Sequence, residues 1–173
     1  IINVNDIRNT IKKNTKLISI MYVNNELGTI NPIEDIASLS KENKILFHSD
    51  AVQYIGKEKI NLLESNIDFL SIGAHKFYGP KGIGALYMKS IHTIDPLISG
   101  GGQESGIRAG TENISCIAGM SLALQLANDN YQKNKDYVLS LENYFIEKLN
   151  KSEINYRING KNRISGIINI TFF

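Results

Sequence analysis

The sequence predicts an α/β fold with a largely parallel sheet. Short apolar runs, typical of buried strands, alternate along the chain with segments whose apolar residues recur at helical spacing. The strand-like runs are nearly continuous rather than alternating, as in parallel sheets that are covered on both faces. The chain has 173 residues, of which 42% are hydrophobic and 21% charged, so it can bury a sizeable core and is not disordered.

Strand and helix signals follow one another in the first half of the chain. A short polar helix is expected at residues 7–13, and Asn31-Pro32 marks the start of a second one, with acidic residues in its first turn. The apolar face of that second helix would consist of Ile33, Ile36, Ala37 and Leu39 or Ser40. Four apolar runs are expected to form strands, at residues 17–23, 45–47, 67–72 and 83–88.

The second half of the chain predicts two helices and then two strands. Helices are expected from Glu112 to about Ala127 and at residues 137–149, separated by a polar hinge at 128–135. An alternating run at 154–158 meets a turn signal, Asn159-Gly160, and a last strand is expected at 167–173. Because the sequence begins without Met and ends inside an apolar run, we expect it to be a piece of a longer chain.

Composition excludes several classes of function. The net charge is only +2 and the basic residues are scattered, which does not suggest a nucleic-acid surface. A single cysteine, Cys116, excludes an internal disulfide framework and a multi-cysteine metal site, so no metal is expected, and it favours a reducing compartment. The sequence contains no apolar run long enough to span a bilayer and no signal peptide at its start.

Two residues that suit one particular chemistry follow predicted strands. Asp50 comes after the run at 45–47, and Lys76 comes after the run at 67–72. Alone, an aspartate after a strand is most often a helix cap, and a lone lysine is usually solvated. Open α/β sheets bind ligands at the carboxyl ends of their strands, where both residues would meet. A lysine that forms a Schiff base, beside a carboxylate that keeps a pyridine nitrogen protonated, predicts pyridoxal phosphate chemistry.

Four segments carry a family resemblance. They are 23–28 (VNNELG), 48–53 (HSDAVQ), 75–87 (HKFYGPKGIGALY) and 100–113 (GGGQESGIRAGTEN). In order and spacing they resemble the motifs of the group I cysteine desulfurases, the NifS and IscS type, in the class V aminotransferase family. The resemblance covers essentially all 173 residues.

The resemblance implies fold type I of the pyridoxal-phosphate-dependent transferases. This fold has a three-layer α/β/α large domain with a mostly parallel mixed sheet, and a smaller α+β domain. Residues 1–130 would belong to the large, cofactor-binding domain without its N-terminal part. Residues 131–173 would begin the C-terminal small domain.

Five residues receive roles in cofactor binding from the resemblance. Lys76 would form the Schiff base and shuttle the substrate proton, and Asp50 would pair with the pyridine nitrogen. Asn25 and Gln53 would hydrogen-bond the phenolic oxygen of the cofactor. His75 would help to hold its phosphate.

The implied activity is conversion of L-cysteine to L-alanine, with the sulfur passed on as a persulfide. The sulfur would serve iron–sulfur cluster assembly and tRNA thiolation, through a scaffold protein and sulfur-acceptor proteins. The enzyme would be a homodimer in which Thr111 reaches the phosphate in the other subunit. It would be cytoplasmic in a bacterium and mitochondrial in a eukaryote.

The sequence departs from the family at one position and lacks parts of its machinery. Gly73 stands three residues before Lys76, where the family usually has a serine or threonine that binds the phosphate. The family's nucleophilic cysteine lies on a loop after the last strand seen here, and Cys116 is expected to be a buried structural thiol instead. The chain alone is therefore expected to be inactive.

Two other functions stay open. A selenocysteine lyase or another class V aminotransferase-like enzyme would share Lys76 and Asp50. A non-catalytic dimeric scaffold that has lost its cofactor is favoured only by Gly73.

Overall fold

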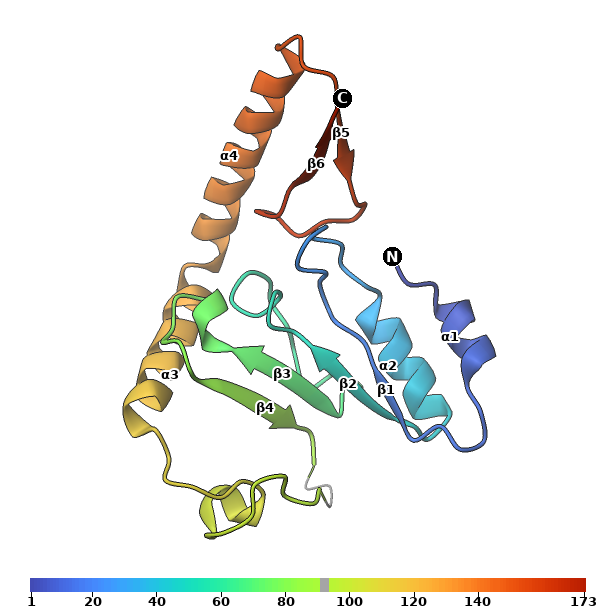
Figure 1. Ribbon diagram of the computed structural model, residues 1–173, viewed down its shortest axis with the longest axis vertical. Helices are drawn as coiled ribbons and strands as arrows, with labels where there is room; N and C mark the ends of the chain where they lie inside the picture. Colours follow the sequence, from blue (N-terminus) through green and yellow to red (C-terminus); the bar gives the residue numbers. More distant parts are fainter. Residues whose placement is uncertain (91–93) are drawn as a thin grey trace.

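A mixed, mostly parallel sheet forms the centre of the molecule. The computed structural model describes residues 1–90 and 94–173 (Figure 1). Four strands hydrogen-bond in the order of the sequence: β1 (Leu17–Ser19), β2 (Leu46–Asp50), β3 (Phe69–Gly73) and β4 (Gly84–Met88). The first three run parallel and β4 runs antiparallel to β3, so the predicted α/β class is confirmed.

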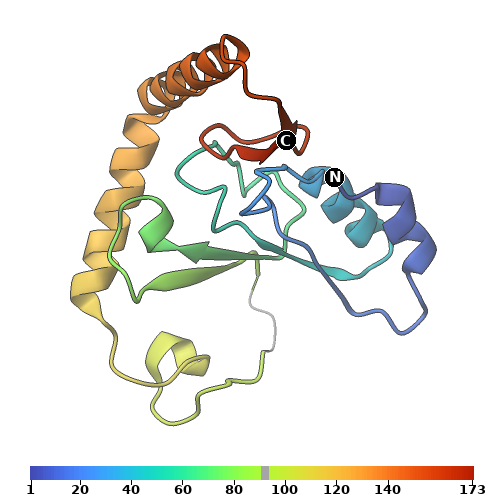
Figure 2. The same cartoon turned by 45° about the horizontal axis from the view of Figure 1, so that its top comes forward.

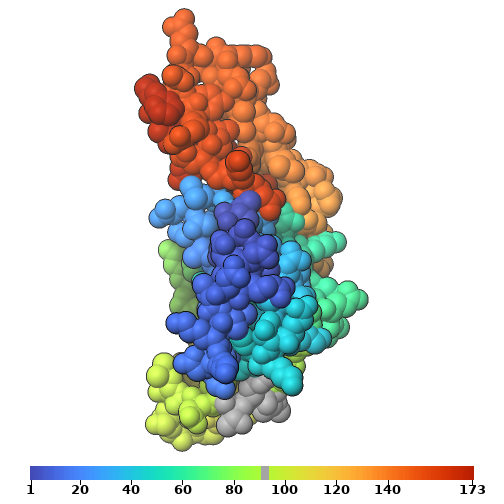
Figure 3. Space-filling model, turned by 90° about the vertical axis from the view of Figure 1, so that its right-hand side faces the viewer, coloured from blue at the N-terminus to red at the C-terminus, as the bar shows by residue number. Residues whose placement is uncertain are grey.

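Four α-helices accompany the sheet in the described part of the chain. They are α1 (Val4–Thr10), α2 (Ile33–Glu42), α3 (Ile114–Asp129) and α4 (Tyr131–Asn150), and two short 3₁₀ turns, η1 (Ala74–Lys76) and η2 (Gln103–Gly106), follow β3 and β4. Helix α1 packs on α2, and Figure 3 shows it on one side of the molecule between the C-terminal segment and the loop that carries η2.

Helix α2 buries the face that its sequence predicts. Its buried residues are Ile33, Ile36, Ala37, Leu39 and Ser40. Ile36 and Ala37 join Phe47 of β2 and Leu70 of β3 in one core cluster. Full burial of such a side chain stabilises the fold by about 1.5–3 kcal/mol, so this contact fixes α2 on one face of the sheet.

The other face of the sheet carries polar groups toward the carboxyl ends of β2 and β3. Because side chains alternate along a strand, His48 and Asp50 point to the side opposite Phe47. Asp50 pairs in register with Ser71, which places a row of polar groups across β2 and β3. On β4 the partner of Ser71 is Leu86, which is 49% exposed.

Several boundaries differ from the sequence prediction because hydrogen bonding decides them. Helix α1 begins at Val4 rather than residue 7, since the side chain of Asn3 caps it by accepting from Asn5 N at 2.9 Å. Strand β1 ends at Ser19, although Tyr22 N still donates to Asp50 O at 2.7 Å beyond it. Strand β2 reaches Asp50 because neighbours on both sides pair with it.

The polar hinge expected at 128–135 is confined to a break at one residue, Asn130. This segment is helical apart from Asn130, which ends α3 and precedes α4. Asn130 N donates to Leu126 O, and Asn134 N donates to Asn130 O, so backbone bonding continues through the junction. The helix direction changes there (Figure 2). The division into a domain of residues 1–130 and one of 131–173 stays a prediction.

A two-stranded antiparallel sheet closes the chain. It pairs β5 (Tyr156–Asn159) with β6 (Asn169–Phe172), and the segment between them lies against the loop after β1. Ile30 N donates to Asn162 O at 2.9 Å, and Ile164 N donates to Gly28 O at 2.8 Å. The predicted turn at Asn159-Gly160 is therefore the start of a longer connection rather than a tight hairpin.

An ion pair also ties this connection to α4. Arg163 Nη2 lies 2.8 Å from Glu142 Oε1, and both side chains are largely buried.

Of the helices in residues 1–90 and 94–173, none is both long enough and apolar enough to cross a membrane.

Ser49→Ala is expected to stabilise the protein by about 1 kcal/mol. The Ser49 hydroxyl is fully buried in β2 and has no hydrogen-bond partner among the described residues. An unsatisfied buried polar group costs about 1–3 kcal/mol. Urea unfolding of the full-length protein measures the effect.

Ser40→Ala is the matched control for Ser49→Ala. The equally buried Ser40 hydroxyl donates to Ile36 O at 2.9 Å. Its loss costs about 0.5–1.5 kcal/mol, offset by about 0.5 kcal/mol of helix propensity, so little net change is expected. A Ser49→Ala protein no more stable than wild type would contradict the burial argument.

Candidate active site

The carboxyl ends of β2 and β3 lie side by side. Beyond the last paired residues, Ala51 N donates to Ser71 O at 3.0 Å. The turns that follow the two strands therefore start next to each other. Asp50 is the last residue of β2, and Gly73 is the last residue of β3. Four of the residues predicted for the site lie at this edge: Asp50 ends β2, Gln53 lies in the turn after it, and His75 and Lys76 lie in the turn after β3.

A tight turn presents Lys76. The carbonyl of Ala74 accepts hydrogen bonds from Phe77 N at 3.1 Å and Gly79 N at 2.9 Å. Phe77 is 2% exposed and anchors the turn in the core, whereas His75 and Lys76 are exposed. In the described part of the chain neither His75 nor Lys76 makes a side-chain hydrogen bond or ion pair, so both are free to bind a ligand.

Asp50 is exposed at the end of β2. One of its carboxylate oxygens, Oδ1, accepts from Val52 N at 2.9 Å, which leaves the other oxygen for a ligand. The carboxylate is thus oriented by the turn that follows it at the edge of the sheet.

His48 lies on the same face of β2 and was given no role by the sequence analysis. Its ring nitrogens hydrogen-bond Ser19 Oγ at 2.8 Å and Ser71 Oγ at 2.9 Å. Burial lowers the pKa of His48, and the nearby charge of Asp50 acts in the opposite direction. The sequence did offer one signal for His48: it lies two residues before Asp50 on the same strand, so both side chains point to the same face of the sheet.

Gln53 is held by a lysine that the sequence analysis also missed. Lys57 Nζ donates to Gln53 Oε1 at 3.0 Å. Burial, and then the charge of Lys76, lower the pKa of Lys57. The position of Lys57 four residues after Gln53 was the only signal in the sequence.

Gly73 has an ordinary extended backbone, with φ −123° and ψ 117°. Serine can adopt this conformation without backbone strain. A Cβ atom there would lie 3.3 Å from Val52 Cγ1 and 3.3 Å from His75 Cε1. These contacts are tight, and they show that the turns after β2 and β3 touch at this point.

Asn25 lies in the loop after β1. The side chain of its neighbour Asn24 shapes this turn by accepting from Leu27 N at 2.8 Å, while Asn25 itself is exposed. The bond from Tyr22 N to Asp50 O brings the start of this loop to the same edge of the sheet. No contact in the described part of the chain joins Asn25 to Asp50 or Gln53.

Thr111 is not brought to the other five residues within one chain. It is exposed, in the segment between η2 and α3. This segment lies below the sheet in Figure 1, away from the carboxyl ends of β2 and β3. The expectation that Thr111 acts in the other subunit of a dimer stays a prediction.

Cys116 is half-buried rather than buried as expected. It lies in the first turn of α3, where its backbone N donates to the side chain of the N-cap residue Asn113 at 3.2 Å.

In the described residues no group of three or more histidine, cysteine or acidic side chains could hold a metal ion.

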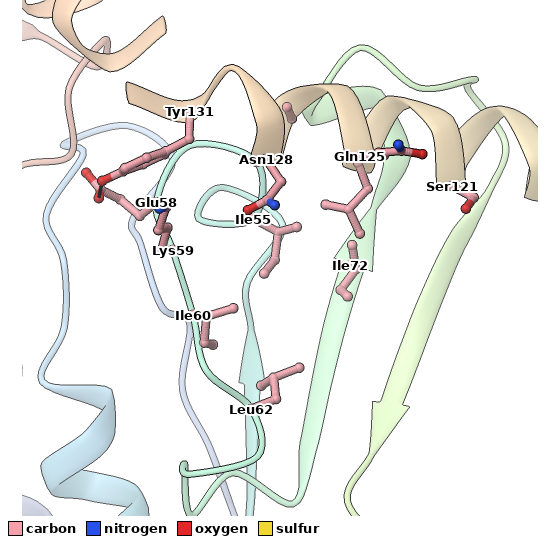
Figure 4. Close-up of a pocket in the computed structure, with 13 residues that line it drawn as sticks. Ile55, Glu58, Lys59, Ile60, Leu62, Ile72, Ser121, Gln125, Asn128 and Tyr131 are labelled. Atoms are coloured by element: carbon pink, nitrogen blue, oxygen red, sulfur yellow. Dashed lines mark hydrogen bonds between the residues drawn. The ribbon is translucent and has the colours of Figure 1, made fainter. Parts of the chain in front are cut away.

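A separate apolar cavity of about 600 Å³ lies beneath α3. Figure 4 shows Ile55, Ile60, Leu62 and Ile72 around this space, with Glu58, Lys59 and Tyr131 at one end. None of the predicted site residues lines it. The cavity is therefore distinct from the polar edge of the sheet.

Comparison with known proteins identifies the family. The aminotransferase class-V family matches residues 1–173. The chain belongs to this family. The fold is accordingly the fold type I arrangement of the pyridoxal-phosphate-dependent transferases, as expected from the motifs.

Among curated proteins, this class-V aminotransferase chain is similar to the cysteine desulfurase IscS of Dictyoglomus turgidum. The two are 45% identical over 173 residues, which is 99% of this chain and 44% of the relative. The chain thus spans less than half the length of that relative.

Two solved structures are also similar. A NifS-like protein is 37% identical, with a TM-score of 0.88, over 95% of this chain and 45% of the other. A structure described as SspA in complex with cysteine is 48% identical, with a TM-score of 0.70, over 72% of this chain and 36% of the other.

Gly73→Ser is expected to tighten binding of pyridoxal phosphate relative to Gly73→Ala. Both variants carry the crowded Cβ atom next to Val52 and His75, but only serine adds a hydroxyl for the phosphate. A hydrogen bond to a charged group is worth about 1.5–3 kcal/mol, or about ten- to a hundredfold in dissociation constant. Dissociation of the cofactor is measured at fixed subunit concentration. Equal affinities in the two variants would mean that the missing hydroxyl is of no consequence.

Proposed function

We propose that the protein containing this chain is a pyridoxal-phosphate-dependent cysteine desulfurase, which converts L-cysteine to L-alanine. The observation that carries the proposal is the juxtaposition of two turns, one with Asp50 and Gln53 and the other with His75 and Lys76. The names of the similar proteins support it, since IscS relatives are called cysteine desulfurases and SspA was solved with cysteine.

The donor set of the two turns fits this cofactor. Lys76 offers a primary amine without a partner in the described residues, which suits an aldehyde. Asp50 keeps one carboxylate oxygen free for a protonated pyridine nitrogen. Gln53 offers an amide for a phenolic oxygen, and His75 is exposed beside Lys76 for a phosphate. When bound, the cofactor supplies an electron-withdrawing ring that acidifies the Cα–H bond of an amino acid.

Individual residues of the chain would then have separate roles in cofactor binding and proton transfer. Lys76 Nζ would hold the cofactor and take the proton from Cα of the substrate. Asp50 would hold the proton on the pyridine nitrogen, and Asn25 with Gln53 would orient the ring through its phenolic oxygen. Thr111 would bind the phosphate in the other subunit of a homodimer.

Sulfur transfer would need a cysteine that is not among these 173 residues. The thiolate of that cysteine would attack the substrate sulfur and keep it as a persulfide, while the substrate carbon skeleton leaves as alanine. The persulfide would then pass to a scaffold protein for iron–sulfur clusters and to acceptors for tRNA thiolation. Such an enzyme would work in the cytoplasm of a bacterium or in the mitochondria of a eukaryote.

Lys76→Ala in the full-length protein is expected to abolish turnover of cysteine, by at least about a hundredfold. The variant lacks both the amine that holds the cofactor and the base that takes the Cα proton. The second readout is borohydride reduction, which should fix the cofactor to the wild-type protein and not to the variant. Lys81→Ala removes an exposed lysine of the same motif and should behave as wild type. Cofactor still fixed at one lysine in Lys76→Ala would refute this role.

Cys116→Ser is expected to keep most of the activity. The thiol is half-buried at the start of α3, outside the two turns, and serine there should cost about 1 kcal/mol of stability or less. Persulfide formation from cysteine and cofactor content are measured together. Complete loss of desulfuration with normal cofactor content would make Cys116 the nucleophile.

A further inference from the structure

We infer that Lys57 is a positioning residue that fixes the polarity of the Gln53 amide. Through this contact the NH₂ group of Gln53, and not its carbonyl oxygen, faces an anionic oxygen of the bound ligand. The inference rests on the proposed function, because it concerns the same site.

The hydrogen bond between the two side chains determines the orientation of the amide. Lys57 Nζ and Gln53 Oε1 are 3.0 Å apart. An ammonium group has three donors and no acceptor, so only the carbonyl end of the amide can face it. The NH₂ end must therefore point away from Lys57. Gln53 makes no other side-chain hydrogen bond in residues 1–90 and 94–173, so both NH₂ donors are available.

The electrostatic setting of Lys57 is unfavourable without an anion. The side chain is half-buried, and its pKa is lowered first by burial and then by the charge of Lys76. None of the ion pairs in the described residues includes Lys57. Its neighbour Glu58 is engaged by Lys135 at 2.8 Å and by Tyr131 OH at 2.8 Å. Lys57 thus has no carboxylate partner in the described residues, and a bound anion would stabilise its ammonium group.

Loss of Lys57 would remove the preference between the two orientations of the amide. A freed amide can turn and present its carbonyl oxygen to the ligand, where it would repel an anionic oxygen. Lys57 thus acts through Gln53, and it need not touch the ligand itself.

Binding of pyridoxine 5′-phosphate to the full-length protein tests the inference without relying on activity. This probe keeps the phenolic oxygen and the phosphate but lacks the aldehyde, so its affinity does not depend on attachment to Lys76. Lys57→Met should weaken binding about tenfold, the value of one hydrogen bond to a charged group. Lys57→Arg keeps a donor for Gln53 Oε1 and should bind within about threefold of wild type.

A double-mutant cycle separates positioning from general stability. In a Gln53→Ala background, Lys57→Met should change the affinity less than about twofold, because the amide it orients is gone. Gln53→Glu keeps a partner for Lys57 but offers only acceptor oxygens, so it should bind the probe more weakly than Gln53→Ala. General damage to the fold by Lys57→Met would lower the affinity for the probe equally in the wild-type and Gln53→Ala backgrounds. It would also not make Gln53→Glu bind more weakly than Gln53→Ala.

Three results would overturn the inference. They are wild-type affinity in Lys57→Met, an undiminished effect of Lys57→Met in the Gln53→Ala background, and binding by Gln53→Glu that equals or exceeds that of Gln53→Ala. A wild-type protein that binds neither pyridoxal phosphate nor pyridoxine 5′-phosphate would instead overturn the proposed function, and this inference with it.

Discussion

The hydrogen bond from Ala51 N to Ser71 O carries the pairing of β2 with β3 just past Asp50, the last residue of β2, and two residues short of the end of β3. Parallel strands share one direction, so the turns that follow them leave the sheet at the same edge. Asp50 and Lys76 are 26 positions apart in the sequence, yet this pairing places their turns in contact. A slip of one residue in this register would turn Asp50 to the opposite face, toward the core around Phe47.

The polar face of the sheet is supported by interactions that do not neutralise its charges. Asp50 is oriented by the backbone of Val52, and His48 is held between two serine hydroxyls. Burial lowers the pKa of His48, which favours a neutral ring beside the carboxylate and leaves the charge of Asp50 uncompensated. Hydrogen bonds to neutral partners thus orient both side chains, and no cation pairs with the Asp50 carboxylate in the described part of the chain.

The sequence was most informative where a single pattern decides the outcome. The buried face of α2 follows from the spacing of Ile33, Ile36 and Ala37, and the apolar runs located the strands of the central sheet, though not their exact ends. The region 128–135 was expected to lie outside the helices because it is polar, but its polarity reflects exposure, and it is helical on both sides of the break at Asn130. Lys57 and His48 were missed because their importance depends on contacts across the site, which neither periodicity nor composition reveals.

The turn that carries Lys76 holds an unfavourable backbone conformation two residues after this lysine. Tyr78 has a positive φ of 66°, which costs about 1–2 kcal/mol for a residue other than glycine. Burial of Phe77 contributes about 1.5–3 kcal/mol, and the Ala74 carbonyl accepts two hydrogen bonds from the same turn. These terms exceed the cost, so the turn keeps its shape through the residues that flank Lys76. Lys76 contributes none of this stabilisation, and the shape of the turn is therefore independent of the group that it presents.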